Sequence, residues 1–146
     1  MNLEDSDVDR IGGTLAGNAL SIAAIRATLE HVLTEATYKK AIDLSIRFTH
    51  GVESVITGMG LPWIVKRLGC RSEYWFREKP PKNGGEAFAA TDSELDRYMH
   101  LFSLNRGILM TPFHNMALIA PDTTESDVDY HTQIVRNAVI SFLGDL

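Results

Sequence analysis

The sequence predicts an α+β domain in which helices pack on a small, mostly antiparallel sheet. Two observations lead to this class. Apolar residues recur every three or four positions in the first part of the chain, from Ala19 to about residue 60, and again in two segments after residue 90. This spacing is typical of amphipathic helices. Between these segments the period falls to two, as in half-buried strands. The 146 residues are enough for one domain.

Composition excludes several classes of protein. Hydrophobic residues make up 45% and charged residues 23%, which excludes a disordered, collagen-like or disulfide-scaffold chain. The net charge of −5 provides no basic field for nucleic acid or an anionic membrane. Cys70 is the only cysteine and fits a reducing compartment. No stretch approaches the roughly 20 apolar residues of a membrane helix, and the acidic start is unlike a targeting peptide. We therefore expect a cytoplasmic protein.

Two helices are expected first. Residues 1–11 are acidic and polar, and we expect them to be disordered or frayed. From Ala19 onward, apolar residues at helical spacing predict a helix: Ile22, Ile25, Leu29 and Val32. A longer helix is expected to begin after Thr34 as its N-cap and to end near Gly58 and Gly60. Gly51 lies inside it at a cost of up to about 1 kcal/mol, which predicts a bend or a close packing contact.

A hairpin should follow. Side chains alternate over residues 70–77, with Ser72 and Tyr74 on one face and Arg71, Glu73 and Trp75 on the other. Residues 63–68 form the expected partner strand, and Gly69 marks the turn between them. Residues 79–85 (KPPKNGG) predict an exposed loop.

The rest of the chain alternates again. Residues 91–94 (TDSE) form a capping-box pattern before a third helix, which Gly107 should terminate. Residues 108–111 and 116–119 are short apolar runs, interpreted as strands. Residues 124–127 (TESD) form a second capping-box pattern, which opens the last helix.

Residues that could carry chemistry are few. The five histidines form neither an HExxH motif nor a cluster with cysteine, so no metal site is predicted. His114, near Arg106 and beside Asn115, is the one suggestive histidine. Cys70, on the apolar face of a strand, is interpreted as a buried, inert thiol. No catalytic residue is predicted.

The glycine-rich segment at residues 12–18 (GGTLAGN) allows two interpretations. Glycines, a hydroxyl and an amide before a helix leave backbone N–H groups that can hold phosphate. Equally, the segment is a helix entry capped by Thr14 or Asn18. The residues alone do not choose between these interpretations.

Four segments resemble class III aminotransferases, which are pyridoxal-phosphate enzymes of fold type I. They are residues 13–24 (GTLAGNALSIAA), 104–112 (LNRGILMTP), 113–118 (FHNMAL) and 123–129 (TTESDVD). The likeness is to the branch that contains glutamate-1-semialdehyde aminomutase, and especially to its aminotransferases for β-amino acids such as β-phenylalanine. It implies that residues 12–146 form the small C-terminal domain of such an enzyme, preceded by a long interdomain helix.

The resemblance also implies which functional residues are present. The family's catalytic lysine lies in a large domain upstream, and no lysine of this chain (Lys39, Lys40, Lys66, Lys79, Lys82) matches its context. Thr14 matches the threonine that contacts the phosphate of the neighbouring subunit's pyridoxal phosphate. Arg106 is a candidate for binding a substrate carboxylate. The alternative for Arg106 is a cation that stabilises a helix C-terminus beside Gly107.

The function that follows is that of a truncated class III aminotransferase or aminomutase. The family reaction transfers an amino group through pyridoxal phosphate, and we expect this chain to be inactive alone because the lysine and large domain are absent. Expected partners are a second copy of the chain or a missing large domain, and an amino acid substrate in the complete enzyme. The alternatives are a non-catalytic dimerisation or interaction module, and one chain of a split enzyme.

Overall fold

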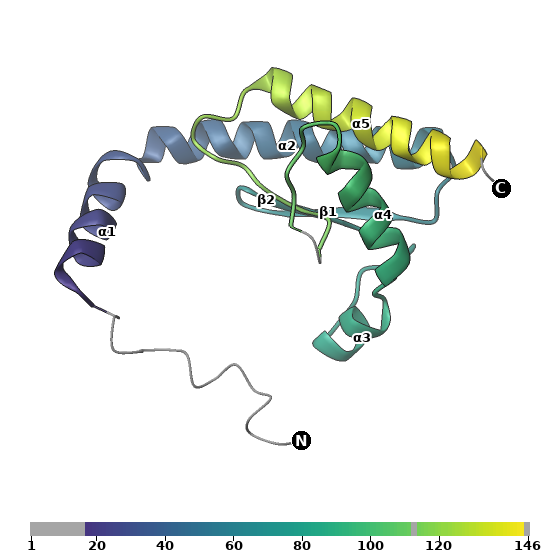
Figure 1. Ribbon diagram of the computed structural model, residues 1–146, viewed down its shortest axis with the longest axis horizontal. Helices are drawn as coiled ribbons and strands as arrows, with labels where there is room; N and C mark the ends of the chain where they lie inside the picture. The colour runs from purple at the N-terminus through teal and green to yellow at the C-terminus, as the bar shows by residue number, and fades with distance from the viewer. Residues whose placement is uncertain (1–16, 112–113, 145–146) are drawn as a thin grey trace. The chain divides into compact units, whose positions relative to one another are not determined.

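The computed structural model describes residues 17–111 and 114–144. They form two compact units that divide between Thr37 and Tyr38. The elements, in order, are α1 (Ala19–His31), α2 (Glu35–Gly58), β1 (Ile64–Leu68), β2 (Arg71–Trp75), α3 (Gly84–Ala89), α4 (Ser93–Leu104), β3 (Met116–Leu118) and α5 (Glu125–Gly144) (Figure 1). The predicted α+β class is confirmed.

Helix α1 begins after Asn18, whose side-chain oxygen accepts a hydrogen bond from the backbone N–H of Ser21 at 3.0 Å. This is the N-cap geometry that satisfies a free N–H of the first turn. None of its residues is buried, and its apolar side chains Ile22, Ile25 and Leu29 are all more than half exposed. The predicted helix is therefore confirmed, and its apolar stripe lies open.

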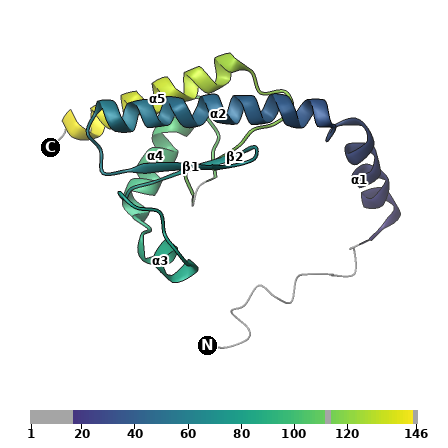
Figure 2. The same ribbon diagram turned by 180° about the vertical axis from the view of Figure 1, so that it is seen from behind.

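In the second unit, α2 and α5 lie side by side over the same face of the sheet (Figures 1 and 2). The core between them comes from every layer: Phe48, Val52 and Val55 of α2, Tyr74 of β2, Met99 of α4, and Val135, Ala138 and Val139 of α5. The Tyr98 hydroxyl ties α4 to α5 by donating to the Ala138 carbonyl at 2.9 Å. Interior Gly51 is a close packing contact, one of the two outcomes predicted, because it faces Thr132 of α5.

The three strands form an antiparallel sheet in the order β1-β2-β3. The predicted hairpin is confirmed: Val65 pairs with Tyr74, and the turn holds Gly69 at a φ of 59°, where glycine is favoured. Ser72 and Tyr74 are buried under the helices, as their alternation predicted.

Helix caps follow the sequence with one correction. Thr34 accepts a hydrogen bond from the backbone N–H of Thr37 at 3.2 Å and caps α2 as predicted. Thr124 and Asp127 cap α5 reciprocally, since each side chain accepts from the other's backbone N–H. The N-cap of α4 is Asp92, whose carboxylate accepts a hydrogen bond from the backbone N–H of Leu95. The capping-box pattern at residues 91–94 predicts Thr91 as the N-cap, and this prediction was wrong.

Two further expectations were wrong. Residues 108–111 have no regular secondary structure and pair with no strand among the described residues. They leave the end of α4 through Gly107, at a φ of 82°, and the Thr111 hydroxyl then donates to the His114 carbonyl. Residues 84–85, expected in a loop, begin the short helix α3, because the Asn83 side chain caps the backbone N–H of Glu86 at 2.9 Å.

Across the described ranges, no helix combines the length and the apolar character that a membrane crossing requires.

Candidate functional site

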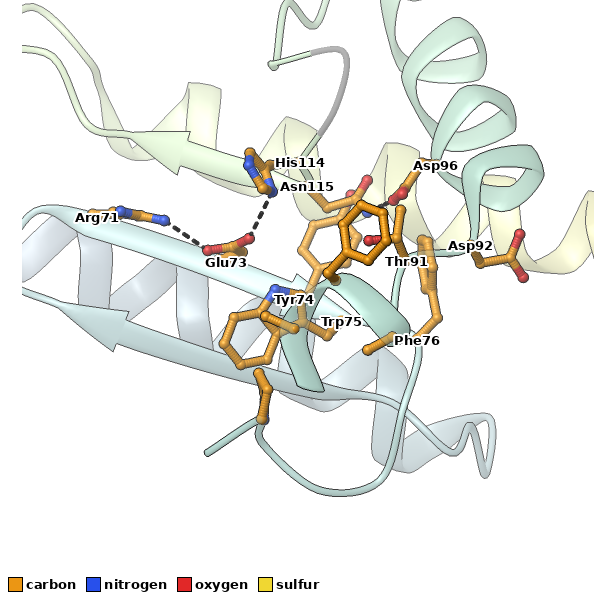
Figure 3. Close-up of a pocket in the computed structure, with 14 residues that line it drawn as sticks. Arg71, Glu73, Tyr74, Trp75, Phe76, Thr91, Asp92, Asp96, His114 and Asn115 are labelled. Atoms are coloured by element: carbon orange, nitrogen blue, oxygen red, sulfur yellow. Dashed lines mark hydrogen bonds and ion pairs between the residues drawn. The ribbon is translucent and has the colours of Figure 1, made fainter. Parts of the chain in front are cut away.

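The candidate site is a cavity of about 380 Å³ against the central strand β2. Side chains from β2, α3, the start of α4 and residues 114–115 enclose it (Figure 3). The sheet supplies Glu73 and aromatic side chains, while the first turns of α4 supply Asp92 and Asp96. The cavity therefore joins charged and aromatic groups from distant parts of the chain.

Glu73 is the buried charge of this cavity. It is only 7% exposed, and its carboxylate lies 2.9 Å from Nη2 of Arg71 and 3.3 Å from Nδ1 of His114 (Figure 3). A buried carboxylate needs such partners, because an unpaired charge is costly away from water. Arg71 is thereby engaged by a residue of its own strand.

Asp96 and Asn115 form the second polar pair. The Asn115 side-chain amide donates to Asp96 Oδ1 at 2.7 Å, and the Asn115 carbonyl accepts from the backbone N–H of Tyr74 at 3.2 Å. Burial raises the pKa of Asp96 above its usual value; the hydrogen bond from Asn115 opposes this shift, and the charge of Asp92 adds to it. Burial, and then the charge of Asp96, raise the pKa of the Tyr74 phenol.

A second cavity, of about 640 Å³, lies between residues 107–111, β3 and α5 and is mostly apolar. His131 lines it, is 4% exposed and stacks on Phe48 with ring centroids 4.4 Å apart. Its Nε2 lies 3.1 Å from the Met110 sulfur. Burial lowers the pKa of His131 to about 4, so the ring is neutral near pH 7 and packs as part of the hydrophobic core.

The predicted site residues lie elsewhere. Arg106, at the end of α4, donates from Nη1 to the Phe102 carbonyl at 3.0 Å, and its guanidinium carbon lies 3.5 Å from the centre of the Phe102 ring. Arg106 does not line the cavity, and its binding of a carboxylate stays a prediction. Thr14 lies outside the described residues. His114, the suggestive histidine, does line the cavity, opposite Glu73.

Two charged groups of the cavity, Glu73 and Asp96, are not predicted by the sequence, and the expectation for Cys70 was wrong. Alternation sets Glu73 opposite Ser72 and Tyr74 but reveals no partner for it, and no motif marks Asp96. Cys70 is partly exposed rather than buried, because it lies in the turn before β2 begins. Within residues 17–111 and 114–144, no three His, Cys, Asp or Glu side chains are placed to hold a metal ion.

The described residues do not fit pyridoxal phosphate by themselves. The cavity presents the carboxylates of Glu73, Asp92 and Asp96, which repel a phosphate, and no lysine lines it. The Lys40 ammonium, for example, donates to the Pro121 carbonyl at 2.9 Å. A covalent bond to the cofactor needs an amine held over its ring, so no step of that chemistry can be assigned to these residues.

Comparisons with known proteins agree with the resemblance seen in the sequence. A scan against models of known protein families finds no match. Glutamate-1-semialdehyde 2,1-aminomutase of Thermus thermophilus is 34% identical over 129 residues, which cover 87% of this chain and 30% of the relative. That of Desulfitobacterium hafniense is 30% identical over 135 residues, or 90% of this chain and 30% of the relative.

Solved structures match in the same way. A glutamate-1-semialdehyde aminomutase from Pseudomonas aeruginosa superimposes with a TM-score of 0.83 and 46% identity, over 88% of this chain and 28% of that one. A β-phenylalanine aminotransferase from Variovorax paradoxus, 19% identical, shares the fold with a TM-score of 0.59 over 76% of this chain and 24% of that one. Over most of its length, the chain is therefore homologous to a portion, about 30%, of glutamate-1-semialdehyde aminomutase and related class III aminotransferases.

Proposed function

We propose that this chain serves as the small domain of a pyridoxal-phosphate enzyme that transfers an amino group of an amino acid. The observation that carries the proposal is the 46% identity to the Pseudomonas aeruginosa aminomutase over 88% of the chain. Since the match spans only 28% of that relative, activity requires the rest of such an enzyme, on the same polypeptide or a separate one.

The lack of a suitably placed lysine among the described residues supports the proposal that another domain supplies the catalytic lysine. Lys39 and Lys40 lie on α2, Lys66 on β1, and Lys79 and Lys82 in the loop before α3; none lines the cavities described above. A large domain would supply the lysine and most cofactor contacts. This chain would contribute Thr14 to the cofactor phosphate and Arg106 to a substrate carboxylate, as the resemblance implies.

The test is a chimera in which this chain replaces the matching portion of the Pseudomonas aeruginosa enzyme. We expect the chimera to bind pyridoxal phosphate, seen as visible absorbance, and to transfer amino groups. Thr14→Ala in the chimera should weaken cofactor binding roughly 10-fold to 150-fold, the value of one hydrogen bond to a charged group. A chimera that folds and assembles but binds no cofactor would contradict the proposal.

The second candidate is a non-catalytic interaction module. The observation that favours it is α1, which buries no residue and exposes Ile22, Ile25 and Leu29 along one stripe. Apolar stripes of this kind mark surfaces that bind another protein. An inactive but well-folded chimera, together with self-association of this chain alone, would favour this candidate.

A further inference from the structure

The cavity against β2 carries more negative than positive charge. Glu73, Asp92 and Asp96 line it with one guanidinium, that of Arg71, and the imidazole of His114, and both of these are already paired with Glu73. In the described part of the chain, Asp96 accepts a hydrogen bond at Oδ1 alone, from Asn115. Its other oxygen accepts no hydrogen bond from a described residue and is available to a ligand.

A second polar group in the cavity also lacks a partner. Tyr74 is 1% exposed and lines the cavity, yet its hydroxyl makes no hydrogen bond to any residue within the described ranges. Buried hydroxyls are nearly always hydrogen-bonded in folded proteins. The charge of Asp96 is close enough to raise the pKa of this phenol further, after burial itself. The Tyr74 hydroxyl and the second oxygen of Asp96 can therefore both accept hydrogen bonds from a ligand that donates them.

The walls fit an apolar body attached to that donor. Trp75, Phe76 and Phe88 line the cavity together with Tyr74. Aromatic faces attract cations and pack well against apolar groups. The volume of about 380 Å³ falls in the range of small-molecule pockets, roughly 300–1,000 Å³.

We propose that this cavity binds a small organic amine through its ammonium group. Asp96 is the counter-ion, the Tyr74 hydroxyl accepts a second hydrogen bond, and the aromatic walls hold the apolar part. An anionic ligand is disfavoured because Arg71 is occupied by Glu73 and the cavity wall carries the carboxylates of Glu73 and Asp96. The site goes beyond the proposed function, since it consists entirely of residues of this chain and needs neither the cofactor nor a large domain.

The test is calorimetric titration of the full chain with benzylamine, with benzyl alcohol and benzoate as probes of similar shape. We expect benzylamine to bind at one site, benzyl alcohol to bind at least about tenfold more weakly, and benzoate not to bind. High salt should weaken benzylamine binding, because it screens the ion pair. The proposal is overturned if benzylamine gives no saturable binding, or if benzyl alcohol binds equally well.

Variants locate the site. Asp96→Asn keeps the shape of the side chain and should weaken benzylamine binding about tenfold or more. Tyr74→Phe removes only a hydroxyl without a partner and should weaken binding by about threefold to tenfold. Asp122→Asn removes the same charge from an exposed residue outside the cavity and should leave binding unchanged.

Thermal unfolding of each variant separates a lost site from a lost fold. If Asp96→Asn fails to fold, the binding of benzylamine to Tyr74→Phe tests the site instead. The Tyr74→Phe substitution breaks no hydrogen bond among the described residues, so this variant should fold. A folded Tyr74→Phe chain that binds benzylamine as tightly as the wild type contradicts the proposed site, because the Tyr74 hydroxyl is then not a partner of the ammonium. If a folded Asp96→Asn chain also binds as tightly as the wild type, the proposed site is wrong.

Discussion

Gly51 of α2 and Thr132 of α5 are in direct contact, because a Cβ atom on Gly51 would overlap the Thr132 hydroxyl. The two longest helices are therefore in contact at a point where one of them has no side chain. Glycine destabilises the interior of a helix relative to alanine, and the close packing of α2 on α5 offsets this loss of stability.

We predict that Gly51→Ala destabilises the fold by about 1–3 kcal/mol, despite alanine's better helix propensity, because Thr132 is β-branched and cannot move aside. Denaturant unfolding measures this change. Adding Thr132→Ala should restore part of the loss, since it removes the overlapping hydroxyl and methyl groups.

The matched control is Gly58→Ala, at the end of the same helix, where an added Cβ meets no atom within 4 Å. It should be neutral or stabilising by up to about 1 kcal/mol. If Gly51→Ala and Gly58→Ala were both stabilising, the close contact between Gly51 and Thr132 would not contribute to the stability of the fold.

Acid should destabilise the fold through His131. Its folded pKa of about 4 lies below the ordinary 6.5, so between these values the unfolded chain binds the proton more readily. Stability therefore falls as the pH drops from 6.5 to 4, by about 3 kcal/mol in all, at about 1.4 kcal/mol per pKa unit. Denaturant unfolding at several pH values measures the slope, and His131→Phe should flatten it. An unchanged slope in that variant would contradict the assignment.

The cap of α5 should be measurable. Thr124 accepts a hydrogen bond from the backbone N–H of Asp127 at 3.2 Å, so Thr124→Ala should lower the free energy of unfolding by about 0.5–2 kcal/mol. Ser126→Ala, two residues further on and exposed, is the control and should change stability by less than about 0.5 kcal/mol. Equal effects at both positions would show that the hydroxyl at 124 does not cap.

The isolated chain should form no specific covalent bond with pyridoxal phosphate. None of its five lysines lines a described cavity beside a group that could orient the cofactor. Borohydride trapping followed by peptide mapping should show scattered, substoichiometric labelling. One lysine labelled stoichiometrically would contradict this prediction.

The open stripe of α1 should cause self-association. Ile25 and Leu29 lie on it and are more than half exposed, and burying such groups against a second copy removes apolar area from water. Sedimentation should show dimers or larger species that Leu29→Lys converts to monomers. Ala27→Lys, about half a turn away from the stripe, should not. A monomeric wild-type chain at every concentration would contradict the prediction.

Periodicity predicted the elements that bury a regular face. Helices α2 and α5 and the β1–β2 hairpin carry apolar residues at the spacing of their own geometry, so local sequence was enough. Residues 108–111 are apolar for another reason. They line the cavity beside His131, and an apolar run cannot by itself reveal whether a partner strand exists. Helix α3 is six residues long, too short for a periodic signal.

The site was harder to predict because its parts are distant in sequence. His114 stood out as a loop histidine, yet its partner Glu73 lies on the other side of α4 in the chain. Alternation correctly placed Glu73 on the face of the strand opposite Ser72 and Tyr74. It could not show that α3, the start of α4 and residues 114–115 enclose that face and bury the charge.

The order of the sheet has a consequence for how the chain folds. Strands β1 and β2 meet across a tight turn, whereas the pairing of Glu73 with Met116 joins residues 43 positions apart. Closing the longer loop costs more chain entropy, so the hairpin should form before β3 joins it. Substitutions in the hairpin should then slow refolding, and those in β3 should mainly speed unfolding, which stopped-flow kinetics would separate.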